Sequence, residues 1–199
     1  MTRSRIAWLR LGPALLLGLL LTRAEAADEV VKTFQDPAFK GTVAKILVVG
    51  VHEDFGVRGQ FENTVARALR SVGTAGEASL YSLSSAAELT PAALVAAATK
   101  ARADAVLVTR VVDVKTENPG ATTTFTEYFQ AYSKYADPMP VTTAYTVRVR
   151  TDLYLVENQT KLWSADSTAI EKQNLFGVID GIAKALTTQL RKDGLIAAR

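Results

Sequence analysis

The sequence predicts an α/β protein: a β-α-β-α-β unit with parallel strands, followed by an antiparallel β-hairpin and a C-terminal helix, forming a mixed sheet with helices packed on it. Three observations predict this fold class. Residues 44–51 form an almost unbroken apolar and β-branched run, which is typical of a strand buried on both faces. Apolar residues recur at helical spacing between such runs. Apolar and charged residues alternate over 145–156, which indicates a strand with one face in water.

The chain begins with the three parts of a secretory signal peptide. These are a basic leader, an apolar run and a small-x-small cleavage site: Arg3, Arg5 and Arg10, residues 11–21, and residues 24–26. The apolar run is well short of the roughly 20 residues that a membrane-spanning helix needs. We therefore expect cleavage after Ala26, a periplasmic location and no integral membrane span in the mature form.

Loss of the signal peptide changes the charge balance. The chain has 23 basic and 20 acidic residues, and 19 of each remain once the first 26 residues are removed. The basic excess belongs to the discarded segment, so we expect no nucleic-acid partner. The chain also has no cysteine, which excludes disulfides, thiolate metal sites, cysteine nucleophiles and the lipidated cysteine of a bacterial lipoprotein.

Residues 27–42 form a lead-in with Pro37, mixed charges and scattered apolar residues, and we expect it to pack loosely. Residues 43–199 are expected to form a single α/β domain with an aromatic-rich insertion at 118–142. The mature length is sufficient for one domain to bury a core without disulfides or a metal.

The β-α-β-α-β unit follows the strand at 44–51. A helix is predicted over 60–72, ended by Gly73, and a short strand over 78–83. Thr90 is the predicted N-cap of the second helix, with Pro91 at its first position. The third strand is predicted over 104–115. If the first strand lies between the other two, the two helices cover opposite faces of the sheet.

The hairpin pairs residues 145–156 with 161–169 through a polar turn at 157–160. Arg148, Arg150 and Asp152 lie on the wet face of the first hairpin strand. We expect ion pairs with Asp166 of the second strand there, and contact with a partner is the alternative. An amphipathic stripe then predicts the C-terminal helix, with its members at Leu175, Val178, Ile179, Ile182, Leu186 and Leu190.

Three short segments carry a resemblance to known proteins: Lys45-Ile-Leu-Val-Val-Gly50, Ala103-Asp-Ala-Val-Leu-Val108 and the hairpin that ends in Leu162-Trp-Ser164. Over roughly residues 43–192 the chain resembles a group of bacterial envelope proteins. The group includes the periplasmic domain of the curli secretion channel, the activator of a penicillin-binding protein, and the amino-terminal domain of the Tol-system protein B. The resemblance implies a compact α/β module that binds other envelope proteins and carries no catalytic residues.

His52, Glu53 and Asp54 follow the first strand, at the sheet edge where α/β proteins tend to bind ligands. A histidine beside two carboxylates can act as a base or bind a metal. However, no second histidine is available, and neither a phosphate-binding glycine motif nor a G-x-S-x-G elbow is present. We therefore predict no catalytic residues, no metal and no cofactor, with these three residues as an alternative ligand-binding site.

The insertion at 118–142 concentrates aromatic residues at spacings of three and four: Phe125, Tyr128, Phe129, Tyr132 and Tyr135. Such spacing aligns most of them on one face of a short helix. Tyrosine-rich surfaces suit protein recognition because they bury a large area at small entropic cost. Two interpretations remain open: the aromatic face binds a partner, or it caps one end of the sheet.

The sequence thus predicts an exported, non-enzymatic accessory protein that binds an envelope protein or envelope polymer. The alternative is a periplasmic small-ligand-binding protein with a cleft near the end of the first strand.

Overall fold

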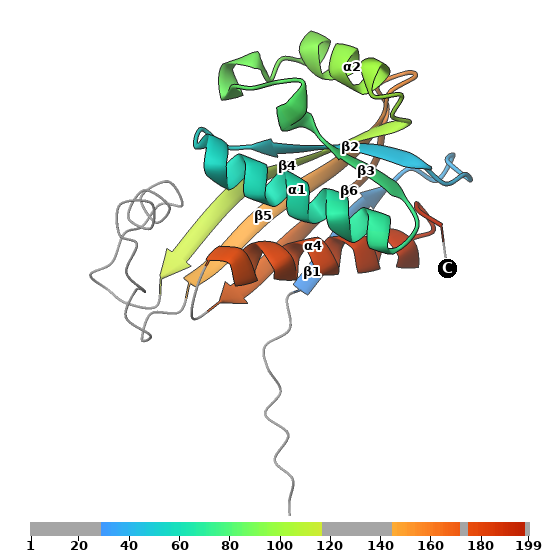
Figure 1. The fold of residues 1–199 in the computed structure, drawn as a ribbon. Helices are drawn as coiled ribbons and strands as arrows, with labels where there is room; N and C mark the ends of the chain where they lie inside the picture. Colours follow the sequence, from blue (N-terminus) through green and yellow to red (C-terminus); the bar gives the residue numbers. More distant parts are fainter. Residues whose placement is uncertain (1–28, 117–144, 172–174, 198–199) are drawn as a thin grey trace, which may run out of the picture.

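The structure, a computed structural model, describes residues 29–116, 145–171 and 175–197. Its centre is a six-stranded mixed sheet with the strand order β1-β6-β5-β4-β2-β3 (Figure 1). The strands are β1 (Glu29–Gln35), β2 (Lys45–Val51), β3 (Ala75–Ala78), β4 (Ala105–Thr116), β5 (Tyr145–Leu155) and β6 (Lys161–Glu171). The helices are α1 (Phe55–Ser71), α2 (Pro91–Lys100) and α4 (Leu175–Lys192), with the short 3-10 turns η1 (Ser79–Tyr81) and η2 (Ala86–Glu88). The predicted fold class is confirmed.

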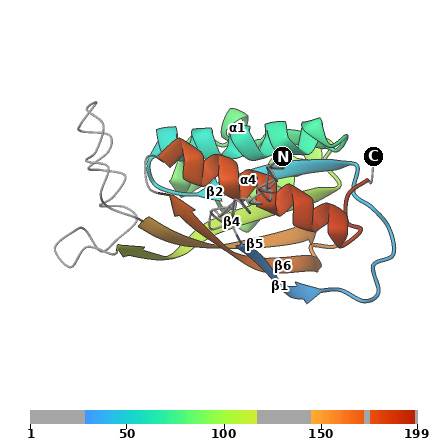
Figure 2. The same cartoon turned by 90° about the horizontal axis from the view of Figure 1, so that it is seen from below.

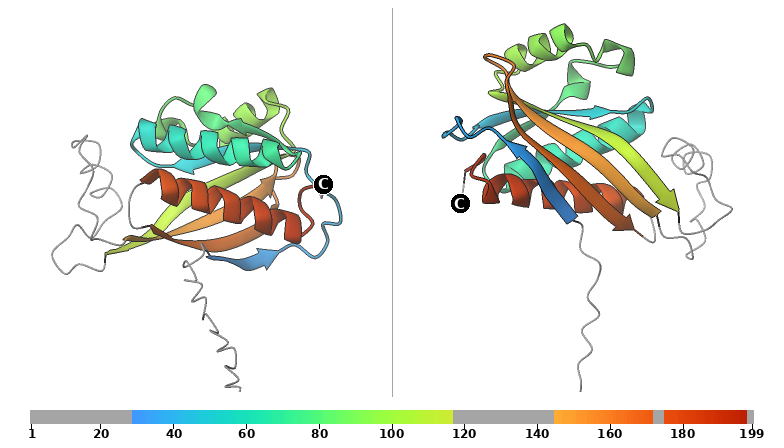
Figure 3. Two further views of the ribbon diagram at one scale, coloured as in Figure 1. Left: turned by 60° about the horizontal axis from the view of Figure 1, so that its bottom comes forward. Right: turned by 180° about the vertical axis from the view of Figure 1, so that it is seen from behind.

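Strand β2 lies between β3 and β4 and is parallel to both, as the β-α-β-α-β pattern predicts. Because successive side chains of a strand point to opposite faces, β2 contributes to two cores. Ile46 and Val48 pack in the core under α1 and α4, whereas Leu47 and Val49 pack against α2. The α1 and α4 helices lie side by side on one face of the sheet, and α2 lies on the other (Figures 2 and 3).

Local signals place both helices of this unit. Asp54 caps α1 by accepting a hydrogen bond from the Val57 backbone N–H at 2.8 Å, so the helix begins five residues before the predicted start. Gly73 follows α1 with a φ of 93°, a conformation that favours glycine. Thr90 caps α2 with Pro91 at the first turn, which confirms the prediction.

The hairpin of β5 and β6 is antiparallel, and its alternation is confirmed. Val147, Val149 and Leu153 are buried under α4, while Arg148 faces solvent. The Arg150 guanidinium pairs with the Asp166 carboxylate through two hydrogen bonds of 2.8 Å, from Nε and Nη2. The expected ion pair across the strands is therefore present.

Strand β1 is not among the predicted elements, because the sequence indicates only a loose lead-in there. It pairs with β6 along Glu29–Gln35, and two of its side chains reach the end of α4. The Lys32 ammonium lies 3.2 Å from an Asp193 carboxylate oxygen, and the Gln35 amide donates to the Asp193 carbonyl at 2.9 Å. These are contacts with residues about 160 positions away in the chain, which local patterns do not reveal.

The strand predicted at 78–83 also differs from the structure. The pairing with β2 covers Ala75–Ala78 and stops where η1 begins. The strand ends there because the Ser79 side chain joins a buried polar cluster, which is described below. Among the helices that the structure describes, none is both long and apolar enough to span a membrane.

Candidate functional site

One edge of the sheet gathers both regions that the sequence marks as candidate sites. We call it the carboxyl edge, because the parallel strands β2 and β4 end there. The antiparallel strand β5 begins at this edge, and so do helices α1 and α4, which follow β2 and β6. The carboxyl ends of parallel strands are the usual place for ligands in α/β sheets.

His52, Glu53 and Asp54 lie at this edge and take different roles. The Asp54 carboxylate is occupied in capping α1, and Glu53 is exposed to solvent. The Asp54 backbone N–H donates to His52 Nδ1 at 3.0 Å, which assigns the ring proton of the neutral histidine to Nε2. The three side chains therefore do not converge on a common point. No group of three metal-ligating side chains suited to a metal ion occurs within the described parts of the chain.

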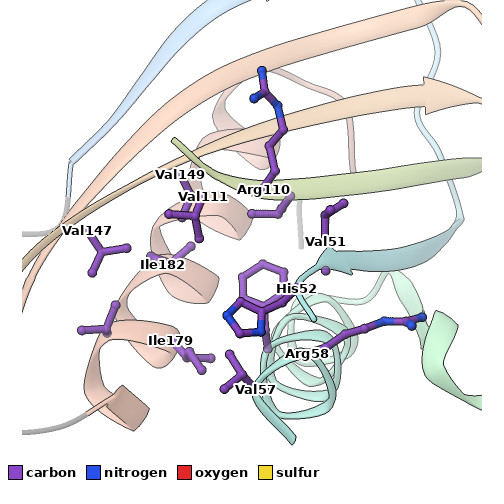
Figure 4. Close-up of a pocket in the computed structure, with 14 residues that line it drawn as sticks. Val51, His52, Val57, Arg58, Arg110, Val111, Val147, Val149, Ile179 and Ile182 are labelled. Atoms are coloured by element: carbon purple, nitrogen blue, oxygen red, sulfur yellow. The ribbon is translucent and has the colours of Figure 1, made fainter. Parts of the chain in front are cut away.

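The His52 ring points into a small cavity between α1, α4 and the sheet, with Val57 and Ile179 beside it (Figure 4). Its walls are mainly aliphatic and aromatic, with Val57, Phe61, Val149, Val178, Ile179 and Ile182 among them. The cavity has a volume of about 40 Å³. A single water needs about 10–15 Å³, and small-molecule sites usually have about 300–1,000 Å³. This cavity holds a few waters or one small apolar group.

Thr109 is a polar residue on the cavity wall, and its hydroxyl shares a hydrogen bond of 2.9 Å with the Thr151 hydroxyl. Burial lowers the pKa of His52, while the nearby charges of Asp54 and Glu53 act in the opposite direction without overcoming it. His52 is thus a neutral side chain at neutral pH, held by its own loop.

A buried ion pair lies directly behind this loop, and sequence reasoning missed it. Arg58 Nε donates to Glu62 Oε1 at 2.8 Å, and both side chains are almost completely buried. Ser79 Oγ also donates to Glu62 Oε1, while the backbone N–H groups of Gly50 and Leu80 donate to the two oxygens of the same carboxylate. The carboxylate is thereby compensated, as burial of a charge requires.

This Arg58–Glu62 cluster positions the site. The bond to Gly50 holds the end of β2, one residue before the exposed Val51 and two before His52. Arg58 also donates to Ser79 Oγ at 2.8 Å and to the Ser85 carbonyl at 3.2 Å. The spacing of four residues between Arg58 and Glu62 indicates an ion pair along one helix face. It does not show whether that pair is buried, because exposed i,i+4 pairs have the same spacing.

The aromatic insertion lies outside the described residues, and so do its five predicted contact residues, Phe125, Tyr128, Phe129, Tyr132 and Tyr135. The structure shows where this segment is attached. Thr116 at the end of β4 pairs with Tyr145 at the start of β5, beyond the end of β2. The insertion therefore leaves and re-enters the sheet at the carboxyl edge.

Two exposed aromatic side chains mark the starts of the helices at the same edge. Phe55 in the first turn of α1 is 52% exposed, and Phe176 in the first turn of α4 is 47% exposed. The carboxyl edge thus combines a small apolar cavity, exposed aromatics and the attachment of the aromatic insertion.

The sequence matches no protein-family model and no curated protein. Solved structures include similar ones. The chain is similar to the PelC dodecamer from Paraburkholderia phytofirmans, with 20% identity over 80% of this chain and 95% of that chain and a TM-score of 0.47. It is also similar to lipoprotein GNA1162 from Neisseria meningitidis, with 18% identity over 75% of this chain and 99% of that chain and a TM-score of 0.45. The expected kinship with the curli, penicillin-binding-protein and Tol groups stays a prediction.

Proposed function

We propose that this protein is an exported, non-enzymatic accessory protein of the cell envelope, and that it acts by binding another envelope protein at the carboxyl edge of its sheet. The observation that carries the proposal is the attachment of the aromatic insertion at Thr116 and Tyr145, at the same edge of the sheet where α1 and α4 begin with the exposed Phe55 and Phe176. Aromatic side chains dominate the energetic centres of protein interfaces. The signal-peptide pattern of residues 1–26 supports delivery to the envelope.

Two features support binding over chemistry. At the carboxyl edge, the side chains of His52, Glu53 and Asp54 do not converge: Asp54 caps α1, and His52 accepts a hydrogen bond from the Asp54 backbone. Catalysis needs a nucleophile, a base and a stabilising group brought together. The most deeply buried charges, Arg58 and Glu62, neutralise each other inside the fold and present no free group to a substrate.

The test replaces Tyr128, Phe129 and Tyr132 together by alanine in the full-length exported protein. Crosslinking followed by affinity purification from envelope extract should then lose the partner that the unaltered protein captures. The matched control is Tyr81→Ala, which removes a tyrosine that is 70% exposed on η1 and does not belong to the aromatic insertion. That variant should keep the partner.

The folding of the triple variant separates the two interpretations of the insertion. If its thermal unfolding matches that of the unaltered protein and capture is lost, the aromatic side chains act as contacts. If the variant unfolds globally, the aromatic side chains belong to the core, and the proposed contact surface is wrong.

A second candidate function, binding of a small exported ligand, rests on the cavity beside His52. Its volume of about 40 Å³ restricts a ligand to a few non-hydrogen atoms unless the edge opens. Native mass spectrometry of protein purified from its own compartment decides this candidate. A stoichiometric added mass supports it, and the mass of the bare polypeptide contradicts it.

A further inference from the structure

The face of the sheet opposite α1 and α4 is only partly covered. Helix α2 lies over the β2 and β4 end of this face, and the described residues place no helix over β5, β6 and β1 (right panel of Figure 3). We call the uncovered part the open face. Three apolar side chains on it are half exposed: Val31 at 50%, Phe34 at 43% and Val51 at 44%.

A row of side chains crosses the open face from β2 to β1. Strand registers set Val51 beside Arg110, Arg110 opposite Arg150, Arg150 opposite Asp166, and Asp166 opposite Val31. Directly opposed residues of paired strands point to the same face, so the row is apolar at both ends and charged in the middle. It spans four inter-strand steps, or about 19 Å.

The charges of this row do not balance. Arg150 is engaged by Asp166 in a bidentate pair, and Arg110 is the like-charged residue directly across from Arg150. Opposed like charges destabilise a strand pair. Among the described residues, no carboxylate lies within ion-pair distance of Arg110, which is exposed.

An apolar groove borders the row on the side of α2. It has a volume of about 250 Å³, and Leu94, Val95, Val108 and Tyr154 line it. Within α2 only Ala97 and Ala98 are fully buried, while Leu94 and Val95 in the preceding turns are half-buried and face the groove. A volume of this size accepts an apolar side chain of a partner.

We propose that the open face binds an acidic, amphipathic segment of a partner protein. An apolar side chain of that segment fills the groove beside α2, a carboxylate pairs with Arg110, and further apolar contacts are made at Val31 and Phe34. Apolar positions flank the charge on both sides, which fits a polypeptide better than a uniformly charged polymer. This surface is separate from the carboxyl edge and goes beyond the function proposed above.

The experiment places a photoreactive benzoylphenylalanine at position 34 of the full-length protein in its own envelope and identifies the crosslinked peptides by mass spectrometry. The expected product is a peptide of one partner protein with net negative charge. Arg110→Glu should lower its yield at least fivefold, and so should a rise in salt from about 0.1 M to about 1 M, which shortens the screening length to about 3 Å. Arg67→Glu, the same charge reversal on the exposed side of α1, should leave the yield unchanged.

Four results overturn the proposal: a crosslink to a second copy of this chain, a crosslink to lipid or glycan alone, a peptide crosslink whose yield changes neither with Arg110→Glu nor with salt, and no crosslink. If Arg110→Glu does not fold, Arg110→Gln removes the charge without reversing it and should still lower the yield. The alanine variant of Tyr128, Phe129 and Tyr132 does not alter this face. Failure of the carboxyl-edge proposal and failure of this one are therefore separable.

Discussion

Asp193 accepts a hydrogen bond of 2.8 Å from the indole N–H of Trp163. The bond joins the residue that follows α4 to Trp163 near the start of β6, and the Trp163 side chain is completely buried. The same carboxylate receives the Lys32 ammonium of β1 and the Gln189 amide of α4. Asp193 thus connects three elements that are far apart in the sequence.

This connection predicts a dependence of stability on pH. Burial raises the pKa of Asp193, but the hydrogen bonds from Gln189, Trp163 and Lys32 outweigh it and hold the pKa below its usual value. Because the folded-state pKa is the lower one, the stabilisation is present above about pH 4 and is lost as the pH falls through the folded pKa. Asp193→Asn should lower the free energy of unfolding by about 1.5–3 kcal/mol at pH 7, measured by urea denaturation. The variant should also lose less free energy of unfolding between pH 5 and pH 3 than the unaltered protein. An equal loss in the two proteins over this pH range contradicts the role of Asp193.

His52 should weaken the fold in mild acid. Burial lowers its pKa in the folded state, so the unfolded chain takes up a proton first as the pH falls through about 6.5. The free energy of unfolding should therefore be greatest above pH 7 and decline toward the folded pKa. His52→Asn keeps an acceptor near the Nδ1 position but does not titrate, so its denaturation midpoint should change less between pH 7.5 and pH 5. An equal change of the denaturation midpoint with pH in the two proteins would show that His52 does not cause the loss of stability in mild acid.

Breaking the buried ion pair should be severe. Glu62→Ala leaves the Arg58 guanidinium buried without its carboxylate, and we expect a loss of about 3–5 kcal/mol in the free energy of unfolding. Arg67→Ala, on the exposed side of the same helix, should change stability by less than about 0.5 kcal/mol. The double variant Arg58→Met with Glu62→Leu should lose less than Glu62→Ala, because it leaves no unpaired charge. Denaturant titrations measure all three, and equal losses for the single and double variants would contradict this explanation.

At Gly76 the backbone of β3 lies close to the backbone of α1. A Cβ atom there would lie 2.6 Å from the Ala66 carbonyl oxygen and 2.8 Å from the Ala66 Cα, both backbone atoms. Gly76→Ala should therefore cost about 1–3 kcal/mol of stability. Gly59→Ala is the matched control. Gly59 lies inside α1, and a Cβ atom there would meet only Leu80 Cδ2, at 3.6 Å. It should stabilise the protein by about 0.5–1 kcal/mol, so similar thermal midpoints for the two variants would contradict the packing argument.

The predictable parts of the fold were those that depend on local chemistry. Strand β2 is apolar at nearly every position, and Thr90 with Pro91 is a complete helix start, so neighbouring residues were sufficient to place both. Strand β1 could not be found in this way, because its stability comes from β6 and from Asp193 at the other end of the chain.

The candidate site shows the same limit. The sequence placed His52, Glu53 and Asp54 at the correct edge of the sheet, since that follows from the order of strands and helices. It could not show that Asp54 is used as a helix cap or that His52 faces an apolar cavity. The burial of Arg58 and Glu62 depends on the backbone of η1, which supplies the Leu80 N–H, and helical periodicity treats such charged residues as outward-facing.

The most direct test of the central claim, that this protein works by docking at the carboxyl edge, is photocrosslinking from position 176 in the native envelope. Phe176 lies in the first turn of α4 at that edge and is half exposed, so a benzoylphenylalanine there reports what contacts the edge. One dominant protein adduct is expected from position 176. It should be lost in the alanine variant of Tyr128, Phe129 and Tyr132, and it should be absent from position 100, an exposed site at the end of α2 near the starts of β2 and β4. No protein adduct at position 176, or the same adducts from positions 176 and 100, would contradict docking at the carboxyl edge.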